Sequence, residues 1–580
     1  MTATRGRSSQ NSADQSPWDL AGQAMDYLGS QSPVRSESDM VGFGKALGLT
    51  ARGLAARPVK VSAASARFAT GLARCTATAL ERELGLDRPP TFPVDPRDRR
   101  FADPAWTGNA GFALLQQYFL ATNRLAEQLI ADAGLSAVTE RKARLAASLL
   151  LDLVAPTNFL LTNPAALKRA FDTGGSSVAK GAANFVDDLL HNNGRPRQVD
   201  SSSFVIGENI AATPCKVVFR NDLMELLQYE PQTEHVHSTP LLFSPPWINK
   251  YYVMDLAPGR SFVEWAVKQN RTVFAISYLN PSADMAGVTL DDYMVKGPKA
   301  ALDVITEITG AETVDIVGLC VGGALTAITD AYLTQTGDQR VGNLTLLNTM
   351  LDYSDPGILG VFTDASTVDQ LEEKMTADGF LSGESMAATF NALRANDLIF
   401  NYVASNWLMG QDPPAFDILA WNADSTRMPA AMHAFYLRNF YVENKLAAGE
   451  LLMGGERIHL GSVKQHCYIV GAENDHIVPW TAAYATTQLV SGPTRFVLSS
   501  GGHIAGIVNP PGPKGWYQVS DDTPSTPEAW RKTADKQAGS WWTDWAHWST
   551  THSGDLVDPP GIGSQAYPVL GVGPGDYVLS

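Results

Sequence analysis

The segment Gly318-Leu319-Cys320-Val321-Gly322-Gly323 places a cysteine among small residues where the expected secondary structure changes. The run 313–317 before it is rich in valine and isoleucine and predicts a buried strand, whereas the run 324–333 after it predicts a helix. A sharp strand-to-helix turn exposes a nucleophile, and it needs glycines because neighbouring backbones approach closely. We expect Cys320 to be that nucleophile and the Val321 amide to donate to an oxyanion. The alternative is a buried cysteine that acts as a small hydrophobic residue.

A carboxylate and an imidazole follow later in the chain, each after a predicted strand. Asp475 lies in the loop after the strand-like run 465–470, and His503 follows the run 495–498 and a Gly-Gly turn. Nucleophile, acid and histidine occur in this order in α/β-hydrolases, where all three lie at the carboxyl ends of strands. We expect a Cys320–His503–Asp475 triad. Taken separately, Asp475 is also typical of a turn and His503 of a loop histidine.

The elements that must position these residues alternate along the second part of the chain. Strand-like runs near 216–220, 240–243, 272–276 and 341–347 are separated by lengths that suit helices, including 290–308, which predicts a parallel sheet covered on both faces. The fold class is therefore α/β, and specifically an α/β-hydrolase fold. The alternation stops between about 351 and 460, and an insertion of this length predicts a cap (lid) subdomain over the site. A structural thickening of the domain is the alternative.

The rest of the chain divides by composition. Residues 1–36 are rich in Ser, Gln, Asp and Arg and predict a flexible tail. Residues 37–200 predict a mostly helical N-terminal domain, and residues 201–580 the catalytic domain. The segment 244–250, which follows a strand and contains Pro-Pro-Trp, is expected to supply a second oxyanion donor from the backbone near Trp247 or Ile248; a packing corner is an equal alternative.

Composition excludes several functional classes. The chain of 580 residues has a formal net charge of −16, so no general attraction to nucleic acid is expected. Its four cysteines are far apart, so neither a disulfide framework nor a metal site is expected. His235-x-His237 has metal-like spacing but no supporting ligands and is interpreted as surface. His476 is interpreted as structural, and no cofactor is expected. The N-terminus lacks an apolar segment of the signal-peptide type, which favours the cytoplasm.

The sequence resembles the class I polyhydroxyalkanoate synthases. The resemblance covers nearly all of the chain after residue 36. Its motifs are Asp98-Arg99-Arg100-Phe101-Ala102-Asp103-Pro104-Ala105-Trp106, Pro156-Thr157-Asn158-Phe159, Pro245-Pro246-Trp247-Ile248-Asn249-Lys250, Gly318-Leu319-Cys320-Val321-Gly322-Gly323, Pro413-Pro414-Ala415-Phe416-Asp417-Ile418-Leu419 with Trp421-Asn422, Asp475-His476-Ile477-Val478-Pro479-Trp480 and Gly502-His503-Ile504-Ala505-Gly506.

The resemblance implies an acyltransferase that polymerises (R)-3-hydroxyacyl-CoA, with a preference for short side chains such as 3-hydroxybutyryl, and releases CoA. It implies a covalent acyl-thioester on Cys320, a growing polyester chain, and a homodimer at the surface of cytoplasmic storage granules with granule-associated proteins. It also raises a second role for Asp475, in activating the attacking hydroxyl. Asn249 and Arg394 are candidate substrate contacts, and Lys250 is a further candidate for the CoA phosphates. Surface or structural charge is the alternative for both basic residues.

Two other functions fit the same residues. A thioesterase or ester hydrolase would use the same triad with water as the acceptor. A granule-binding scaffold would keep the fold without chemistry, and would show no substrate protection of Cys320 against thiol reagents.

Overall fold

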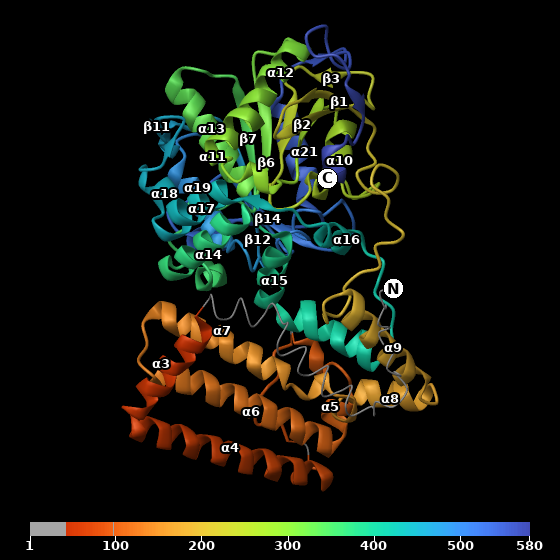
Figure 1. The fold of residues 1–580 in the computed structure, drawn as a ribbon, viewed down its shortest axis with the longest axis vertical. Helices are drawn as coiled ribbons and strands as arrows, with labels where there is room; N and C mark the ends of the chain where they lie inside the picture. The colour runs from red at the N-terminus through yellow and green to blue at the C-terminus, as the bar shows by residue number, and fades with distance from the viewer. Residues whose placement is uncertain (1–41, 87, 97) are drawn as a thin grey trace, which may run out of the picture. The chain divides into compact units, whose positions relative to one another are not determined.

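The described residues of this computed structural model are 42–86, 88–96 and 98–580, and they form two units that we describe separately (Figure 1). One unit consists of the chain up to Gln198 together with Arg394–Pro413, and the other of Val199–Leu393 and Pro414–Ser580. The expected tail 1–36 lies outside the described residues. No helix in the described ranges has the length and apolar character needed to cross a membrane.

The first unit is helical, and polar side chains cap several of its helices. The Ser136 hydroxyl accepts a hydrogen bond from the Thr139 amide. Asn163 directly precedes Pro164, the first residue of another helix, and its side chain accepts a hydrogen bond from the Ala166 amide. The mostly helical character expected for this part of the chain is confirmed. The helices of this unit are α3 (Phe43–Ala55), α4 (Pro58–Glu83), α5 (Ala105–Gly108), α6 (Ala110–Asp132), α7 (Ala137–Leu153), α8 (Pro164–Asp172) and α9 (Ser176–His191).

The segment Arg394–Pro413 joins this unit although it falls inside the insertion expected at 351–460. Its π-helical turns Asn396–Phe400 and Val403–Leu408 are held by polar contacts. The Arg100 guanidinium donates to Asp152 and Asn396 over 2.9 and 2.8 Å, and the Trp407 indole donates to Asp188 over 2.8 Å. The insertion is therefore divided between the two units.

The second unit is built on a sheet that, within the described residues, has 11 strands. The six central strands run parallel, and antiparallel strands flank them on both sides. The strands predicted from sequence are confirmed. The order is β15 (Asp535–Ala538), β14 (Trp516–Ser520), β13 (Thr494–Ser499), β12 (Cys467–Ala472), β7 (Val341–Leu347), β6 (Val314–Leu319), β4 (Leu241–Ser244), β5 (Val273–Tyr278), β2 (Met224–Tyr229), β1 (Cys215–Arg220) and β17 (Gly571–Val572).

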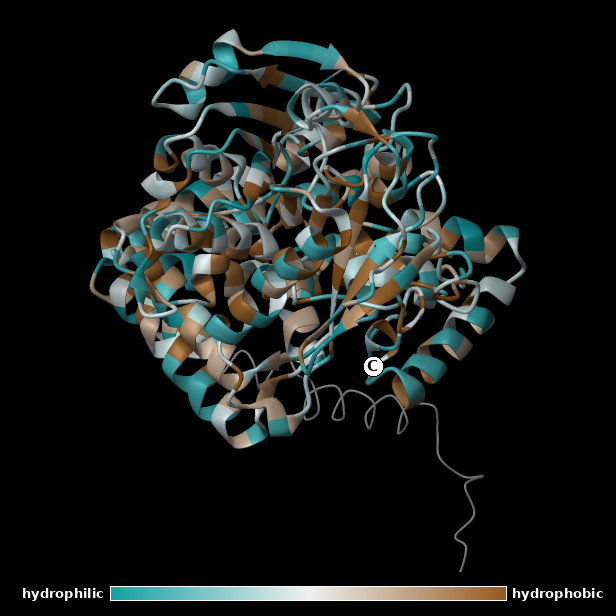
Figure 2. Ribbon diagram, turned by 90° about the horizontal axis from the view of Figure 1, so that it is seen from above, coloured by the Kyte–Doolittle hydropathy of each residue, from teal (hydrophilic) through white to brown (hydrophobic). Residues whose placement is uncertain are grey.

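The central strands are buried on both faces, as parallel strands usually are. Side chains alternate along β6, so that Ile316 joins one hydrophobic cluster and Val317 the other. On one face the cluster includes α12 (Ala300–Thr309), α13 (Val321–Thr336) and α19 (Trp480–Leu489). On the other it includes α10 (Phe262–Lys268) and the tryptophan-rich α21 (Trp541–His552). Colouring by hydropathy shows brown strands inside and teal segments at the periphery (Figure 2).

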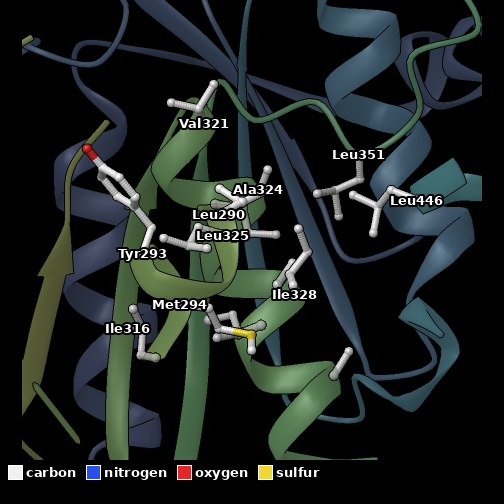
Figure 3. Packing of buried hydrophobic residues seen from close by; sticks show 14 of the residues in the cluster. Leu290, Tyr293, Met294, Ile316, Val321, Ala324, Leu325, Ile328, Leu351 and Leu446 are labelled. Atoms are coloured by element: carbon white, nitrogen blue, oxygen red, sulfur yellow. The ribbon is translucent and has the colours of Figure 1, made fainter. Parts of the chain in front are cut away.

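The helix expected over 290–308 is interrupted. It forms α11 (Leu290–Met294), a π-helical turn over Val295–Lys299 and then α12. Pro298 lacks an N–H donor, and Gly297 leaves helical geometry with φ −92° and ψ −111°. Leu290, Tyr293 and Met294 of α11 lie near the side chains that α13 presents to the cluster (Figure 3).

The parts of the insertion that stay in the second unit are mostly helical. They follow β7 and precede β12 in the sequence, and residues such as Tyr353, Tyr436 and Phe440 join the same hydrophobic cluster as α13. Their helices are α14 (Ala365–Asp378), α15 (Gly383–Leu393), α16 (Asp417–Ala423), α17 (Ala430–Tyr436), the π-helical η10 (Leu437–Val442) and α18 (Lys445–Ala448).

Candidate active site

Cys320 occupies the tight turn between β6 and α13. Its φ of 53° and ψ of −121° are strained for a residue with a side chain, and such strain is typical of functional turns. The Cys320 amide donates to the Leu347 carbonyl over 2.9 Å, which ties the turn to β7. Val321 then begins α13 at the end of the sheet (Figure 3). The Val321 amide has no hydrogen-bond partner within the described chain, so it is free to donate to a ligand.

Two glycines after Cys320 let the turn pack tightly. A Cβ on Gly322 would collide with the backbone carbonyl oxygens of Ser244 and Pro245, and a Cβ on Gly323 would collide with the Thr349 hydroxyl. The loop after β4 therefore lies directly against the start of α13. This is the loop from which the sequence predicts a second oxyanion donor.

Asp475 and His503 meet at the carboxyl ends of β12 and β13. His503 Nδ1 lies 2.6 Å from Asp475 Oδ2, and Asp475 Oδ1 accepts from the Ile477 and Val478 amides over 2.8 and 2.9 Å. Both side chains are buried. The carboxylate is therefore fixed by two backbone donors while its other oxygen orients the imidazole.

The sulfur of Cys320 also acts electrostatically on the His503 ring. Burial disfavours the charged imidazolium, but the Asp475 carboxylate and the Cys320 sulfur outweigh it, so the pKa of His503 is raised well above 6.5. An imidazole with a raised pKa is suited to take the proton of a cysteine nucleophile.

The candidate oxyanion and substrate contacts are less clearly tied to the site than Asp475 and His503 are. Ile248 is partly buried, packs against the same cluster as Cys320, and its carbonyl accepts from the Thr426 hydroxyl over 2.5 Å. Asn249 forms an isolated β-bridge with Ser425. Lys250 is 3% exposed, and its ammonium donates to the Ser580 carbonyl over 2.5 Å. Burial lowers the pKa of Lys250, so it is no surface charge.

Arg394 belongs to the helical unit, where it forms an ion pair with Asp397. Its proposed contact with substrate stays a prediction. His235 is about half exposed, but His237 is buried in β3 (Val236–His237), where its Nδ1 lies 2.9 Å from the Gly554 carbonyl. The surface interpretation of the His-x-His pair is therefore wrong for His237, because β16 (Leu556–Val557) pairs with its strand.

Sequence reasoning did not identify two groups that lie near the candidate nucleophile. Asn348, directly after β7, donates through its side chain to the His503 carbonyl over 2.5 Å. Three tyrosines, Tyr353, Tyr436 and Tyr441, cluster where the insertion meets Cys320. Their aromatic content was visible in the sequence, but their proximity depends on tertiary packing.

Comparison with known proteins identifies the family. Residues 97–266 match the family model described as "Poly-beta-hydroxybutyrate polymerase (PhaC) N-terminus", and residues 246–510 match "alpha/beta hydrolase fold". The chain is 40% identical over 526 residues to the poly(3-hydroxyalkanoate) polymerase of Methylorubrum extorquens, covering 90% of this chain and 87% of that protein. This chain belongs to the poly(3-hydroxyalkanoate) polymerase family. The α/β-hydrolase fold predicted from sequence is confirmed.

Other members of the polymerase family show similar coverage. The polymerase subunit PhaC of Rhizobium meliloti (strain 1021) is 42% identical over 82% of this chain and 77% of its own length. The polymerase subunit PhaC of Cupriavidus necator is 41% identical over 83% of each chain. The resemblance to polyhydroxyalkanoate synthases is thus confirmed over most of the chain.

Proposed function

We propose that this chain polymerises (R)-3-hydroxyacyl-CoA, with 3-hydroxybutyryl-CoA as the main substrate, into polyhydroxyalkanoate with release of CoA. The observation that carries the proposal is the His503 imidazole, which is held 2.6 Å from Asp475 and is subject to the charge of the Cys320 sulfur, in a chain of the polymerase family. The three residues act as a nucleophile, a base and an orienting acid.

Acylation begins when His503 takes the Cys320 proton. The sulfur attacks the thioester carbonyl, and the Val321 amide, together with the Ile248 amide, stabilises the oxyanion. Collapse breaks the bond to the CoA sulfur, and His503 returns its proton to that leaving thiolate. Because one thioester replaces another, the acyl group keeps its activation for the next transfer. A serine ester would lose it.

Elongation uses the same base. His503 takes the proton of a 3-hydroxyl, whose oxygen attacks the acyl-thioester on Cys320, so that an ester bond forms and the Cys320 sulfur leaves and is reprotonated. Asp475 holds the imidazole tautomer and stabilises the imidazolium. Water in the same position would give free acid, so the cap residues between β7 and β12 exclude it.

We further propose a homodimer that works at the surface of cytoplasmic polyester granules alongside granule-associated proteins. Sedimentation of the purified chain with and without substrate measures the first part, and fractionation of polyester granules from an expressing cell measures the second.

Incubation with (R)-3-hydroxybutyryl-CoA tests the activity. The expected products are free CoA and insoluble polyester, and Cys320→Ala should release no CoA. Cys75→Ala is the matched control, because Cys75 lies buried in the helical unit. Soluble 3-hydroxybutyrate without polyester would make the chain a thioesterase, and CoA release by Cys320→Ala would remove the proposed nucleophile.

A further inference from the structure

Three phenols form a connected group beside the candidate nucleophile, and the proposed function gives them no role. Tyr353 follows β7, Tyr436 ends α17 and Tyr441 lies in η10. The Tyr353 and Tyr436 hydroxyl oxygens are 3.1 Å apart, and the Tyr441 ring lies beside both rings. The rings meet edge to face, with centroids 4.8 to 6.1 Å apart in the three pairs. We name these residues the phenol group.

The hydroxyls of the phenol group are polar atoms in otherwise apolar surroundings. Tyr353 and Tyr436 are 3% and 4% exposed, and Phe440 and Trp247 pack against them. Cys320, Ile248 and Tyr441 lie against this same hydrophobic cluster. The phenol group and Cys320 therefore belong to one packed region.

The hydroxyls remain protonated. Burial raises the pKa of each phenol, and the charge of the Cys320 sulfur raises it further, so all three lie within electrostatic reach of that sulfur. Each phenol therefore offers one proton. One hydrogen bond joins Tyr353 and Tyr436, whereas the Tyr441 side chain is only partly buried, so its hydroxyl can reach a ligand.

A partly buried hydroxyl of this kind donates to water or to a ligand, because an O–H withdrawn from both loses free energy. When a ligand occupies the site, the acceptor is one of its oxygens. The thioester carbonyl is already assigned to the Val321 amide at the start of α13, and the next oxygen along a 3-hydroxyacyl group is on C3. This oxygen is also the one that distinguishes the proposed substrate from an ordinary fatty acyl-CoA.

We propose that the phenol group of Tyr353, Tyr436 and Tyr441 binds the 3-oxygen of the hydroxyacyl group and is the element that selects 3-hydroxyacyl-CoA over unsubstituted acyl-CoA. This inference rests on the proposed function. A hydroxyl bound in this way accepts from a phenol and keeps its own proton free to donate to His503. A site built to bond a hydroxyl rejects the analogue that lacks it far more strongly than an apolar pocket does, because its own polar groups are then left unpaired.

Single-turnover acylation tests the inference. Enzyme in excess is mixed with (R)-3-hydroxybutyryl-CoA or with butyryl-CoA, and the rate of CoA release is measured for each, giving a selectivity ratio. The variants are Tyr353→Phe, Tyr436→Phe, Tyr441→Phe and the triple variant, which keep the rings and remove the hydroxyls. Tyr293→Phe is the matched control, because Tyr293 is also a buried phenol that packs against Trp247 but lies outside the phenol group.

We expect the triple variant to lower the selectivity ratio by roughly tenfold or more, because the hydroxyacyl substrate reacts more slowly while butyryl-CoA, which no longer leaves hydroxyls unpaired, reacts at its wild-type rate or faster. Tyr293→Phe should keep the wild-type ratio. Equal loss with both substrates would show a purely structural role and overturn the inference, as would an unchanged ratio in every variant. A wild-type protein that releases CoA from neither substrate would instead overturn the proposed function, and the inference with it.

Discussion

The side chain of Asn348 donates a hydrogen bond to the backbone carbonyl of His503 over 2.5 Å, and so links the end of β7 to the loop that carries the candidate base. Asn348 is fully buried, its own amide donates to the Val470 carbonyl of β12 over 2.8 Å, and its φ is 42°. Asparagine tolerates this left-handed conformation better than most residues. Asn348 therefore positions His503 without contacting the nucleophile.

Replacing Asn348 separates the contribution of its side-chain hydrogen bond from that of its left-handed backbone conformation. Asn348→Ala should lose about 1–3 kcal/mol of unfolding free energy from the unpaired His503 carbonyl, and a further ~1 kcal/mol from the positive φ. Asn348→Gly relieves the backbone strain but still lacks the donor. Both variants should lower kcat, measured by CoA release, and only Asn348→Ala should carry the additional loss in thermal stability. Wild-type kcat in Asn348→Gly would contradict the positioning role.

Asp475→Asn removes the negative charge that faces His503 while keeping the size of the side chain. The asparagine can no longer accept from Nδ1 and two backbone amides in the same way, so the imidazole loses its fixed tautomer and its stabilised charged form. We expect a fall in CoA release of about 10²–10⁴-fold. Asp424→Asn is a control carboxylate, because Asp424 accepts from the Tyr252 hydroxyl instead. Unchanged turnover in Asp475→Asn would refute the assignment of Asp475.

The same substitution changes how stability depends on pH. The folded-state pKa of His503 is raised above 6.5, so the charged form is favoured by folding. This contribution is fully present below pH 6.5 and is lost as pH rises through the higher folded value. Wild-type protein should therefore lose more stability than Asp475→Asn on going from pH 6 to alkaline pH, which denaturant unfolding at a series of pH values measures. Parallel pH curves for the two proteins would contradict the raised pKa.

Alanine variants of the two glycines after Cys320 should differ in whether a second substitution restores their activity. Gly322→Ala brings a Cβ against the Ser244 and Pro245 carbonyls, and backbone cannot give way, so this variant should lose activity and several kcal/mol of stability. Gly323→Ala collides mainly with the side chain of Thr349, so Thr349→Ala should restore part of its activity. A rescue of Gly322→Ala by Thr349→Ala would show that the close approach is wrongly described.

The sequence predicts the strand-to-helix turn at Cys320, the central strands and the order of Cys320, Asp475 and His503 because those features are local. Valine-rich runs mark buried strands, and glycines mark the turns that follow them. The break in the helix after Leu290 could also have been predicted from the sequence, because a proline, Pro298, lies inside it. Asn348 and the phenol group were not predictable, because their partners are 155 and 83 residues away and are brought close only by packing. The burial of His237 likewise depends on a partner strand near the end of the chain.

A buried carboxylate on α13 gives a final prediction that is independent of catalysis. Asp330 is 1% exposed, and neither of its oxygens has a well-formed hydrogen bond within the described chain. Burial raises the pKa of Asp330 from 3.8 to about 7, and the nearby Thr334 hydroxyl offsets only part of this effect. Folding therefore favours the protonated acid, whose stabilising contribution is complete below pH 3.8 and is lost as pH rises through 7.

Asp330→Asn removes this titration. Between pH 4 and pH 7 the wild-type protein should lose about 3 kcal/mol relative to the variant, since each pKa unit corresponds to about 1.4 kcal/mol and Asp330 is still half protonated at pH 7. The comparison uses the slope of unfolding free energy against pH, which does not depend on the constant free energy of burying the asparagine amide. Asp558→Asn is the control, because the Asp558 side chain is 94% exposed and should leave the slope unchanged. If unfolding curves of the wild type and Asp330→Asn keep the same pH slope, Asp330 is ionised normally, and a solvated or paired carboxylate must replace the buried one described here.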